Sequence, residues 1–245
     1  MSRETWRLLT TWDADARFHM GFDEAQLHRG CEVPTLRFYT WRPDALSLGY
    51  FQPLADVQGI DRATEVVRRM TGGGAIHHTQ ELTFSITVPA GHRLYRGPVA
   101  ESYVRVHAAI AKVLDEIGVS AALRGSDPAS SDRTGTGMCF HASTPLDLVW
   151  DGRKGVGSAQ RRRAEGILHH GSIKLAPSEL EAGVATVEET SGDPWSPEAF
   201  GAQLAQTMAH EWGLDMRPGE PHADEVTEAL ERGQRFVSRE MIERR

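Results

Sequence analysis

Residues 68–78 read RRMTGGGAIHH, and the strand-like stretch ELTFSITV follows at residues 81–88. Three consecutive glycines weaken any helix or strand interior, because each costs order and offers no side chain to pack. They let a ligand or another backbone come close, and their amide groups can meet negative oxygens. A plain turn between two strands is the simplest interpretation. The flanking Arg69 and His77 favour a binding loop, although the pattern matches neither the phosphate loop nor the dinucleotide fingerprint.

Downstream, the stretch DGRKGVGSAQRR spans residues 151–162. Its first two residues are a strong tight-turn signal, so we expect a hairpin with the strand at residues 146–150. Two further glycines inside the second strand again indicate close approach of a ligand or backbone. Arg153 and Lys154 alternate onto opposite faces, so one of them should point into the space that the glycines line. A solvated lysine is the ordinary alternative.

Cys139 ends a small, polar, glycine-rich segment at residues 125–137, which is typical of a mobile loop. A cysteine followed by phenylalanine is usually buried and inert. Its position at the end of such a loop favours an exposed thiol instead. A reactive thiolate needs a nearby cation or amide donors, and Lys154 and His141 are the candidates. Cys31 ends a predicted helix without such a context, so we interpret it as a small buried residue.

The fourth stretch, GILHHGSI, spans residues 166–173. His169 and His170 are adjacent on a predicted strand and therefore face opposite sides, so they should not share a metal ion. The two cysteines cannot make a disulfide framework, and a zinc site would need several of the 11 histidines to join them. We therefore predict no metal site.

The elements that surround these stretches predict an α+β fold. Apolar residues recur at helical spacing in the predicted helices, and Gly118 stands where one of them should end. Because helices and strands are segregated, we expect one domain over residues 1–245 with a mixed, mainly antiparallel sheet flanked by helices. Its motif core covers residues 5–175, and residues 177–245 should be helical. The other predicted elements are helices 18–29 and 103–117 and strands 35–41, 46–50, 66–69, 81–88 and 167–175.

Composition excludes several classes of protein. A hydrophobic content of 40% and a charged content of 25% argue against disorder. The 27 basic and 34 acidic side chains leave a net charge of −7, so an overall basic footprint for nucleic acid is absent. No apolar run is long enough to cross a membrane, and the first residues lack an apolar signal core. We therefore expect a cytoplasmic protein that binds neither nucleic acid nor membrane.

Three motifs, taken in their order along the chain, resemble the catalytic domain of the superfamily of lipoate–protein ligases, octanoyltransferases and biotin ligases. They are RRMTGGGAIHH with ELTFSI, then GRKGVGSAQRR, then GILHHGSIKL. The likeness begins at about Thr5 and ends at about Leu175. Within the superfamily, the chain most resembles the ligase-like cysteine octanoyltransferases. Their nucleophile lies in a Cys-Phe pair just upstream of the hairpin, as Cys139-Phe140 does here.

This resemblance implies a reaction without a nucleotide. An octanoyl group would pass from a carrier-protein thioester to Cys139 and then to a lysine of a lipoyl domain. The alternative is an ATP-dependent ligase that forms a lipoyl-adenylate, and the intact glycine triplet keeps it open. No cofactor is expected, since ATP and magnesium enter only under the ligase alternative. A non-catalytic protein that binds lipoyl domains is a third possibility, which the presence of Lys154 disfavours.

Site residues follow from the same resemblance. Cys139 would be the nucleophile, and Lys154 would position the acyl carbonyl. The remaining predicted site residues bind the acyl substrate: Arg69, Thr71, Gly72, Gly73, Gly74, His77, Gly157, Ser158, Ala159, His170 and Gly171. The slot should be apolar, because burial is worth on the order of 0.8 kcal/mol per methylene.

The implied partners are proteins. An acyl carrier protein or an octanoylated lipoyl domain would be the donor, and the acceptor would be the glycine cleavage H protein or the lipoyl domain of a 2-oxoacid dehydrogenase E2. Such partners are generally acidic, so this acidic chain needs a local basic landing site. Five cations along the hairpin could supply it, although a solvated charge run is as good an interpretation. They are Arg153, Lys154, Arg161, Arg162 and Arg163.

Overall fold

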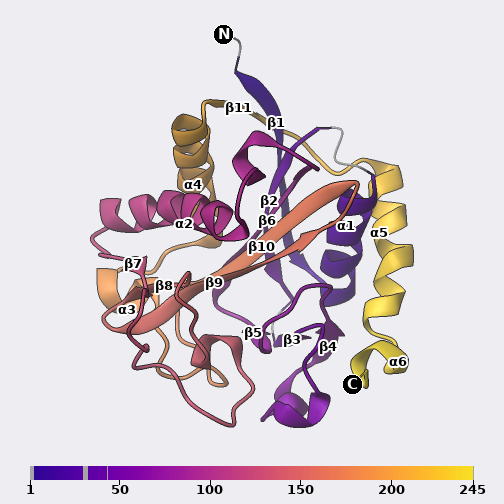
Figure 1. Cartoon of the computed structure of the whole chain (residues 1–245). Helices are drawn as coiled ribbons and strands as arrows, with labels where there is room; N and C mark the ends of the chain where they lie inside the picture. The colour runs from indigo at the N-terminus through magenta and orange to yellow at the C-terminus, as the bar shows by residue number, and fades with distance from the viewer. Residues whose placement is uncertain (1–2, 30–32, 43, 245) are drawn as a thin grey trace.

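The computed structural model describes residues 3–29, 33–42 and 44–244, and its largest element is an eight-stranded sheet (Figure 1). The strand order is β11-β1-β2-β6-β10-β9-β8-β7. Strand β1 pairs in parallel with β2 and β11, and the other neighbours pair antiparallel. A smaller sheet of order β4-β3-β5 lies below it in Figure 1. The strands are β1 (Glu4–Ala14), β2 (Thr35–Trp41), β3 (Ala45–Leu48), β4 (Glu65–Arg68), β5 (Ile76–His78), β6 (Glu81–Pro89), β7 (Ala122–Leu123), β8 (Leu148–Trp150), β9 (Arg153–Arg162), β10 (Gly166–Lys174) and β11 (Leu214–Pro218).

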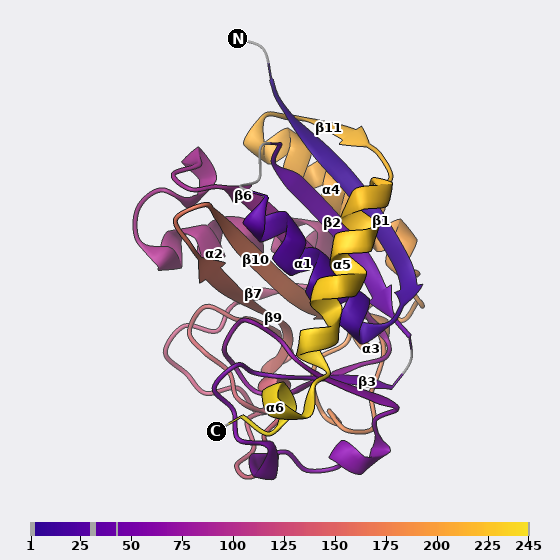
Figure 2. The ribbon, with the colours of Figure 1, turned by 90° about the vertical axis from the view of Figure 1, so that its right-hand side faces the viewer.

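Helices cover both faces of the large sheet. Figures 1 and 2 show α1 and α5 side by side on one face and α2 and α4 on the other. The predicted α+β class, with a mixed and mainly antiparallel sheet flanked by helices, is confirmed. The α-helices are α1 (Ala16–His28), α2 (Val99–Glu116), α3 (Val187–Ser191), α4 (Pro197–Trp212), α5 (Ala223–Phe236) and α6 (Arg239–Ile242). The short 3₁₀ helices are Leu54–Asp56, Ile60–Arg62, Arg93–Tyr95 and Cys139–His141.

The alternation of side chains along β6 separates an apolar core from a polar interior. Its Leu82, Phe84 and Ile86 belong to the large core on the α2 and α4 side. The intervening residues, which include Thr83, are polar yet buried, and they face α1. Buried polar groups must be hydrogen-bonded, and here Trp41 Nε1 donates to Thr83 Oγ1 at 2.8 Å. This polar face forms one wall of the functional site.

A buried ion pair connects α1 to this face. Arg37 of β2 donates to Asp23 of α1 at 2.7 Å, and both side chains are 1% exposed. Burial alone would raise the pKa of Asp23, but the charge of Arg37 and the hydrogen bond from His170 hold that pKa at about 2. Asp23 therefore stays ionised at any pH where the protein would work.

Two parallel strands were missed by the sequence analysis. Residues 4–14 form β1, and β11 interrupts the C-terminal part that was expected to be helical. In β1, Trp6 packs into the core on one face and Leu9 into a cluster on the other. A strand that is covered on both faces carries apolar residues on both. The alternation of apolar and polar residues that marks a half-buried strand is therefore absent from its sequence.

Local signals elsewhere predicted the structure well. The hairpin of β8 and β9 turns at Asp151 and Gly152, whose φ angles are 50° and 71°. Positive φ at both positions is the tight turn that Asp-Gly favours. Helix α2 ends just before Gly118, whose φ of 83° is the left-handed stop expected there.

A buried arginine connects the C-terminal end of the described chain to the small sheet through hydrogen bonds. Arg68 of β4 donates to the carbonyls of Met241 at 2.7 Å and Ile242 at 2.6 Å, in α6. The same guanidinium donates to Gly49 O at 2.5 Å and Gln52 O at 2.6 Å. Helix α6 therefore lies beside the segment that follows β3. None of the described helices combines the length and the apolar character that crossing a membrane requires.

Candidate active site

The glycine loop and the cysteine segment lie side by side. Ala75 donates its backbone N–H to Gly137 O at 2.9 Å, and Cys139 donates its own to Ala75 O at 2.7 Å. These bonds form a short parallel bridge between Ala75 and Met138. Two segments that are about sixty positions apart in sequence are thus fixed against each other.

Glycine is required where the two segments touch. A Cβ atom on Gly74 would lie 2.8 Å from Gly137 O and 2.9 Å from Cys139 N, which is closer than real Cβ contacts. Both neighbours are backbone atoms and cannot turn away. The triplet therefore acts as a close-approach surface for another part of the chain.

Substitution of Gly74 by alanine should displace the cysteine. The new Cβ pushes on the backbone at Cys139, and an error of about 1 Å in a reacting group costs up to ~10²-fold in rate. Under the role that the resemblance implies for Cys139, we expect the rate of its acylation by an octanoyl thioester to fall by about that factor, measured by mass spectrometry of the quenched protein. Gly72→Ala is the matched comparison, because its Cβ would meet only the Phe51 ring at 4.0 Å. An equal loss in both variants would contradict the close-approach explanation.

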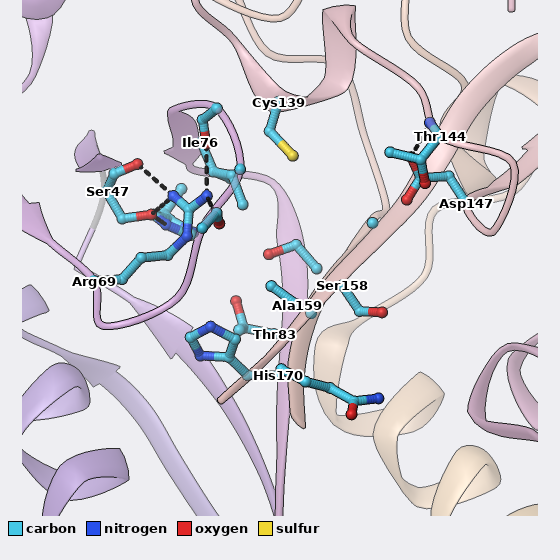
Figure 3. Close-up of a pocket in the computed structure, with 18 of the residues that line it drawn as sticks. Ser47, Arg69, Ile76, Thr83, Cys139, Thr144, Asp147, Ser158, Ala159 and His170 are labelled. Carbon is cyan, nitrogen blue, oxygen red and sulfur yellow. Dashed lines mark hydrogen bonds between the residues drawn. The ribbon is translucent and has the colours of Figure 1, made fainter. Parts of the chain in front are cut away.

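Arg69 holds the glycine loop in shape (Figure 3). Its Nη2 donates to Gly72 O at 2.9 Å and to Gly74 O at 2.7 Å, and its Nη1 donates to Ser47 O at 2.9 Å. The side chain is therefore engaged by carbonyl groups of the protein. Arg69 lines the cavity described below, and its hydrogen bonds organise the glycine loop.

Cys139 faces a lysine ammonium. Lys154 Nζ lies 3.6 Å from Cys139 Sγ and donates to Cys139 O at 2.9 Å. The same ammonium pairs with Asp147 Oδ2 at 2.9 Å, and these two side chains are 2% and 6% exposed. Gly157 makes room for this geometry, since a Cβ there would lie 2.9 Å from Lys154 Cε. Of the pair Arg153 and Lys154, it is the lysine that points inward.

The surroundings of Lys154 keep it protonated. Burial lowers the pKa of the ammonium, but the Cys139 thiolate and the Asp147 carboxylate more than offset that effect, and the pKa is raised. A positive charge therefore stands beside the sulfur. The other candidate cation, His141, is held by Thr136 and by Ala182 O, and burial lowers its pKa.

A cavity of about 620 Å³ opens in front of Cys139. Figure 3 shows the sulfur at one end, with Ser158, Ala159, Thr83 and His170 further along. Most of the predicted site residues line it: Arg69, Gly72, Gly73, Gly74, Cys139, Lys154, Gly157, Ser158, Ala159, His170 and Gly171. Further lining residues that the sequence analysis did not name are Met20, Tyr39, Trp41, Ile76 and Leu146. Their apolar surfaces suit an acyl chain.

Two predicted substrate-binding residues lie outside the cavity. His77 points away from it, with Nδ1 2.8 Å from Ser178 Oγ and Nε2 3.5 Å from Asp44. Successive residues of a strand face opposite sides, so in β5 it is Ile76 and His78 that line the cavity. Thr71 is buried and supports the site indirectly, through a 2.6 Å hydrogen bond to His170.

The two adjacent histidines of β10 serve different sides of the sheet, as the sequence predicts. His170 faces α1, where Nδ1 lies 3.2 Å from Asp23 Oδ2. His169 faces α2, where it contacts Tyr95 at 3.2 Å and Ser158 at 2.9 Å. Cys31, the other cysteine, lies outside the described residues.

Asp147 is a cavity-lining carboxylate that sequence reasoning missed, and it pairs with Lys154. It stands in PLDLVW, an acid enclosed by apolar residues at the start of a strand, and that enclosure was the available signal. Its Oδ2 also accepts from Thr144 N at 2.7 Å, so its orientation is fixed from two sides.

The five cations of the hairpin do not form one surface. Lys154 is buried in the site, and Arg153 pairs with Glu189 at 3.1 Å. Arg162 reaches the other face, where it donates to Tyr95 O at 3.1 Å. Only Arg161 and Arg163 remain together, because alternate residues of a strand share a face.

Comparisons with known proteins match this chain to one family. Residues 15–209 match the model of the lipoyl protein ligase A/B catalytic domain. Octanoyltransferase LipM of Moorella thermoacetica is 41% identical over 182 residues, which cover 71% of this chain and 67% of that protein. LipM of Kyrpidia tusciae is 34% identical, with 91% of this chain and 92% of that protein covered.

Solved structures show the same fold at lower identity. A lipoate–protein ligase A bound with ATP superposes with a TM-score of 0.79 at 20% identity, and 99% of each chain is covered. A bi-partite lipoate protein ligase from Thermoplasma acidophilum, solved in a study that includes its E2 lipoyl domain, gives 0.73 at 21% identity with 98% of each chain covered. By its matched domain and its full-length relatives, this chain belongs to the lipoyl protein ligase A/B catalytic domain family.

Proposed function

We propose that this enzyme moves an octanoyl group from a thioester donor, through Cys139, to a lysine of a lipoyl domain. The chain is an acyltransferase of protein lipoylation, in keeping with relatives named octanoyltransferase at 34% and 41% identity. The observation that carries the cysteine route is the contact of 3.6 Å between Cys139 Sγ and Lys154 Nζ at the cavity wall.

In the first half-reaction, the Cys139 thiolate attacks the carbonyl carbon of the donor thioester. A bond forms to Cys139 Sγ, the bond to the donor sulfur breaks, and the donor leaves as a thiolate, which takes a proton from solvent. The charge that develops on the carbonyl oxygen is negative, and the Lys154 ammonium lies beside the reacting sulfur to stabilise it. Thioester exchange is nearly balanced in energy, so no nucleotide is needed.

In the second half-reaction, the neutral amine of the acceptor lysine attacks the octanoyl-enzyme. The C–N bond forms, the C–S bond breaks, and the proton that the amine loses ends on the released Cys139 sulfur. Acylation has meanwhile removed the thiolate charge, which is one of the two negative neighbours that raise the pKa of Lys154. Lys154 is then a better proton donor than in the free enzyme, and it can relay the proton.

The donor in this proposal is an acyl carrier protein or an octanoylated lipoyl domain, and the acceptor is H protein or an E2 lipoyl domain. Neither half-reaction uses ATP or magnesium. A nucleophilic thiol must stay reduced, so we also place the enzyme in the cytoplasm.

One assay separates the three possible functions. The purified enzyme and an apo lipoyl domain are incubated either with an octanoyl thioester of carrier protein or with free lipoate, ATP and magnesium. We expect an octanoylated lysine with the thioester alone, detected by mass spectrometry. Modification only with lipoate and ATP would show a ligase, and modification in neither mixture would show a non-catalytic protein.

A further inference from the structure

A second cavity, about 520 Å³ in volume, is lined by four arginines that come from separate parts of the chain. Arg161 and Arg163 come from the end of β9 and the turn that follows. Arg235 comes from the end of α5, and Arg244 follows α6. Tyr50 lies among them, and Glu240 is the acidic residue of the lining. We call this the arginine groove.

Three of these arginines, Arg161, Arg163 and Arg244, have no carboxylate partner among the described residues, and Arg163 Nη1 lies 3.1 Å from His28 Nε2. Arg161 and Arg244 lie over the Tyr50 ring, with guanidinium carbons 5.5 and 4.2 Å from its centroid. Arg163 Nε is buried without a hydrogen-bond partner in this part of the structure. Arg235, in contrast, pairs with Glu24 at 2.5 Å. The groove therefore holds a surplus of positive charge on a chain whose net charge is −7.

The groove adjoins the active-site cavity. Arg161 lies two residues beyond Ala159 on the same face of β9, and Ala159 lines that cavity. On the other side, Tyr50 donates its N–H to Thr71 O at 2.8 Å, just before the glycine triplet. Phe51 packs edge-on against Tyr50, with ring centroids 4.9 Å apart, and is 74% exposed. An exposed aromatic ring thus stands between the groove and the glycine loop.

We propose that the arginine groove docks an acidic face of the acceptor lipoyl domain. This inference rests on the proposed function and names the surface that serves it. The acceptor lysine is a short side chain, so its domain must come against the enzyme for the amine to reach Cys139. An acyl group on a long flexible carrier arm has no such requirement. Planar guanidinium groups held on an aromatic ring are also suited to bidentate contacts with carboxylates.

The test is a double charge reversal, Arg161→Glu with Arg244→Glu. Neither side chain has a carboxylate partner to lose, and a melting curve checks that the variant is folded. The probe is a fluorescent apo lipoyl domain, which is titrated with each variant. We use H protein or an E2 domain, whichever accepts the octanoyl group faster from the unmodified enzyme. We expect Kd to rise at least tenfold at low salt, and the difference to shrink as salt is raised. Arg161→Gln with Arg244→Gln should give a smaller rise.

The matched control is Arg62→Glu with Arg217→Glu, which changes the net charge equally at exposed positions outside the groove. An unchanged Kd in the groove variant, or an equal rise in the control, would overturn the docking site. The docking site would also be overturned if the groove variant bound the carrier protein more weakly and the lipoyl domain as tightly as before. Binding is measured without turnover, whereas acylation of Cys139 by octanoyl-pantetheine is followed separately. The binding result can therefore be interpreted even if Cys139 is not acylated.

Discussion

Replacement of Cys139 by alanine is expected to lower the rate of octanoyl transfer to a lipoyl domain by ~10³-fold or more, because it removes the group that forms the acyl intermediate. Hydroxyl groups of Thr83, Thr144 and Ser158 also line the cavity. None of them has the ammonium contact that Cys139 has. A serine at position 139 should be nearly as inactive, because a hydroxyl is far less acidic than a thiol.

Mass spectrometry of the enzyme after incubation with an octanoyl thioester checks this result. The unmodified enzyme should carry one octanoyl group on the peptide that contains Cys139, and Cys139→Ala should carry none. Cys31→Ala is the control, since it removes the other cysteine of the sequence and should keep the adduct. An unaltered transfer rate in Cys139→Ala would end the covalent mechanism.

Lys154→Met should be the second most damaging change, with two separable consequences. The rate of Cys139 acylation should fall by ~10²-fold or more, because the charge that stabilises the thiolate and the oxyanion is gone. The folded state should lose about 3 kcal/mol as well, because Asp147 is left as an unpaired buried carboxylate. Thermal unfolding and the acylation rate measure the two effects independently.

A second substitution distinguishes the chemical from the structural role of Lys154. Adding Asp147→Asn to Lys154→Met removes the unpaired charge, and an asparagine oxygen can still accept from Thr144 N. We expect the double variant to recover most of the lost stability while its acylation stays as slow as in the single variant. Recovery of the acylation rate in the double variant would mean that the lysine merely neutralises Asp147.

Much of the fold was predictable because its signals are local. Asp151-Gly152 specifies its turn within two residues, and Gly118 ends α2 through its own backbone angle. The strands β1 and β11 were missed for the opposite reason. Apolar residues of β1 pack on both of its faces, and β11 is a five-residue strand at the sheet edge, so distant parts of the chain decide where both strands pair.

The residues of the site also divide into those that the sequence could predict and those that it could not. Motifs and their order were enough to single out Cys139, Lys154 and the glycine triplet. The mistaken placement of His77 came from treating a motif as a unit, whereas alternation along β5 sends His77 and His78 to opposite sides. Asp147 escaped notice because its importance lies in a contact of 2.9 Å with Lys154.

The amino-acid sequence by itself determined the α+β class, and its ordered motifs carried the resemblance that implied the reaction family and the roles of Cys139 and Lys154. The fold class follows from residue types and short spacings, and each motif is a short stretch of sequence, so both are local properties. Only the tertiary structure decided that Lys154 points inward, that Asp147 holds it, and that Arg161 and Arg163 join Arg235 and Arg244 in one groove. Contacts between distant segments form when the sheet and its helices pack together, and no short stretch of sequence specifies them.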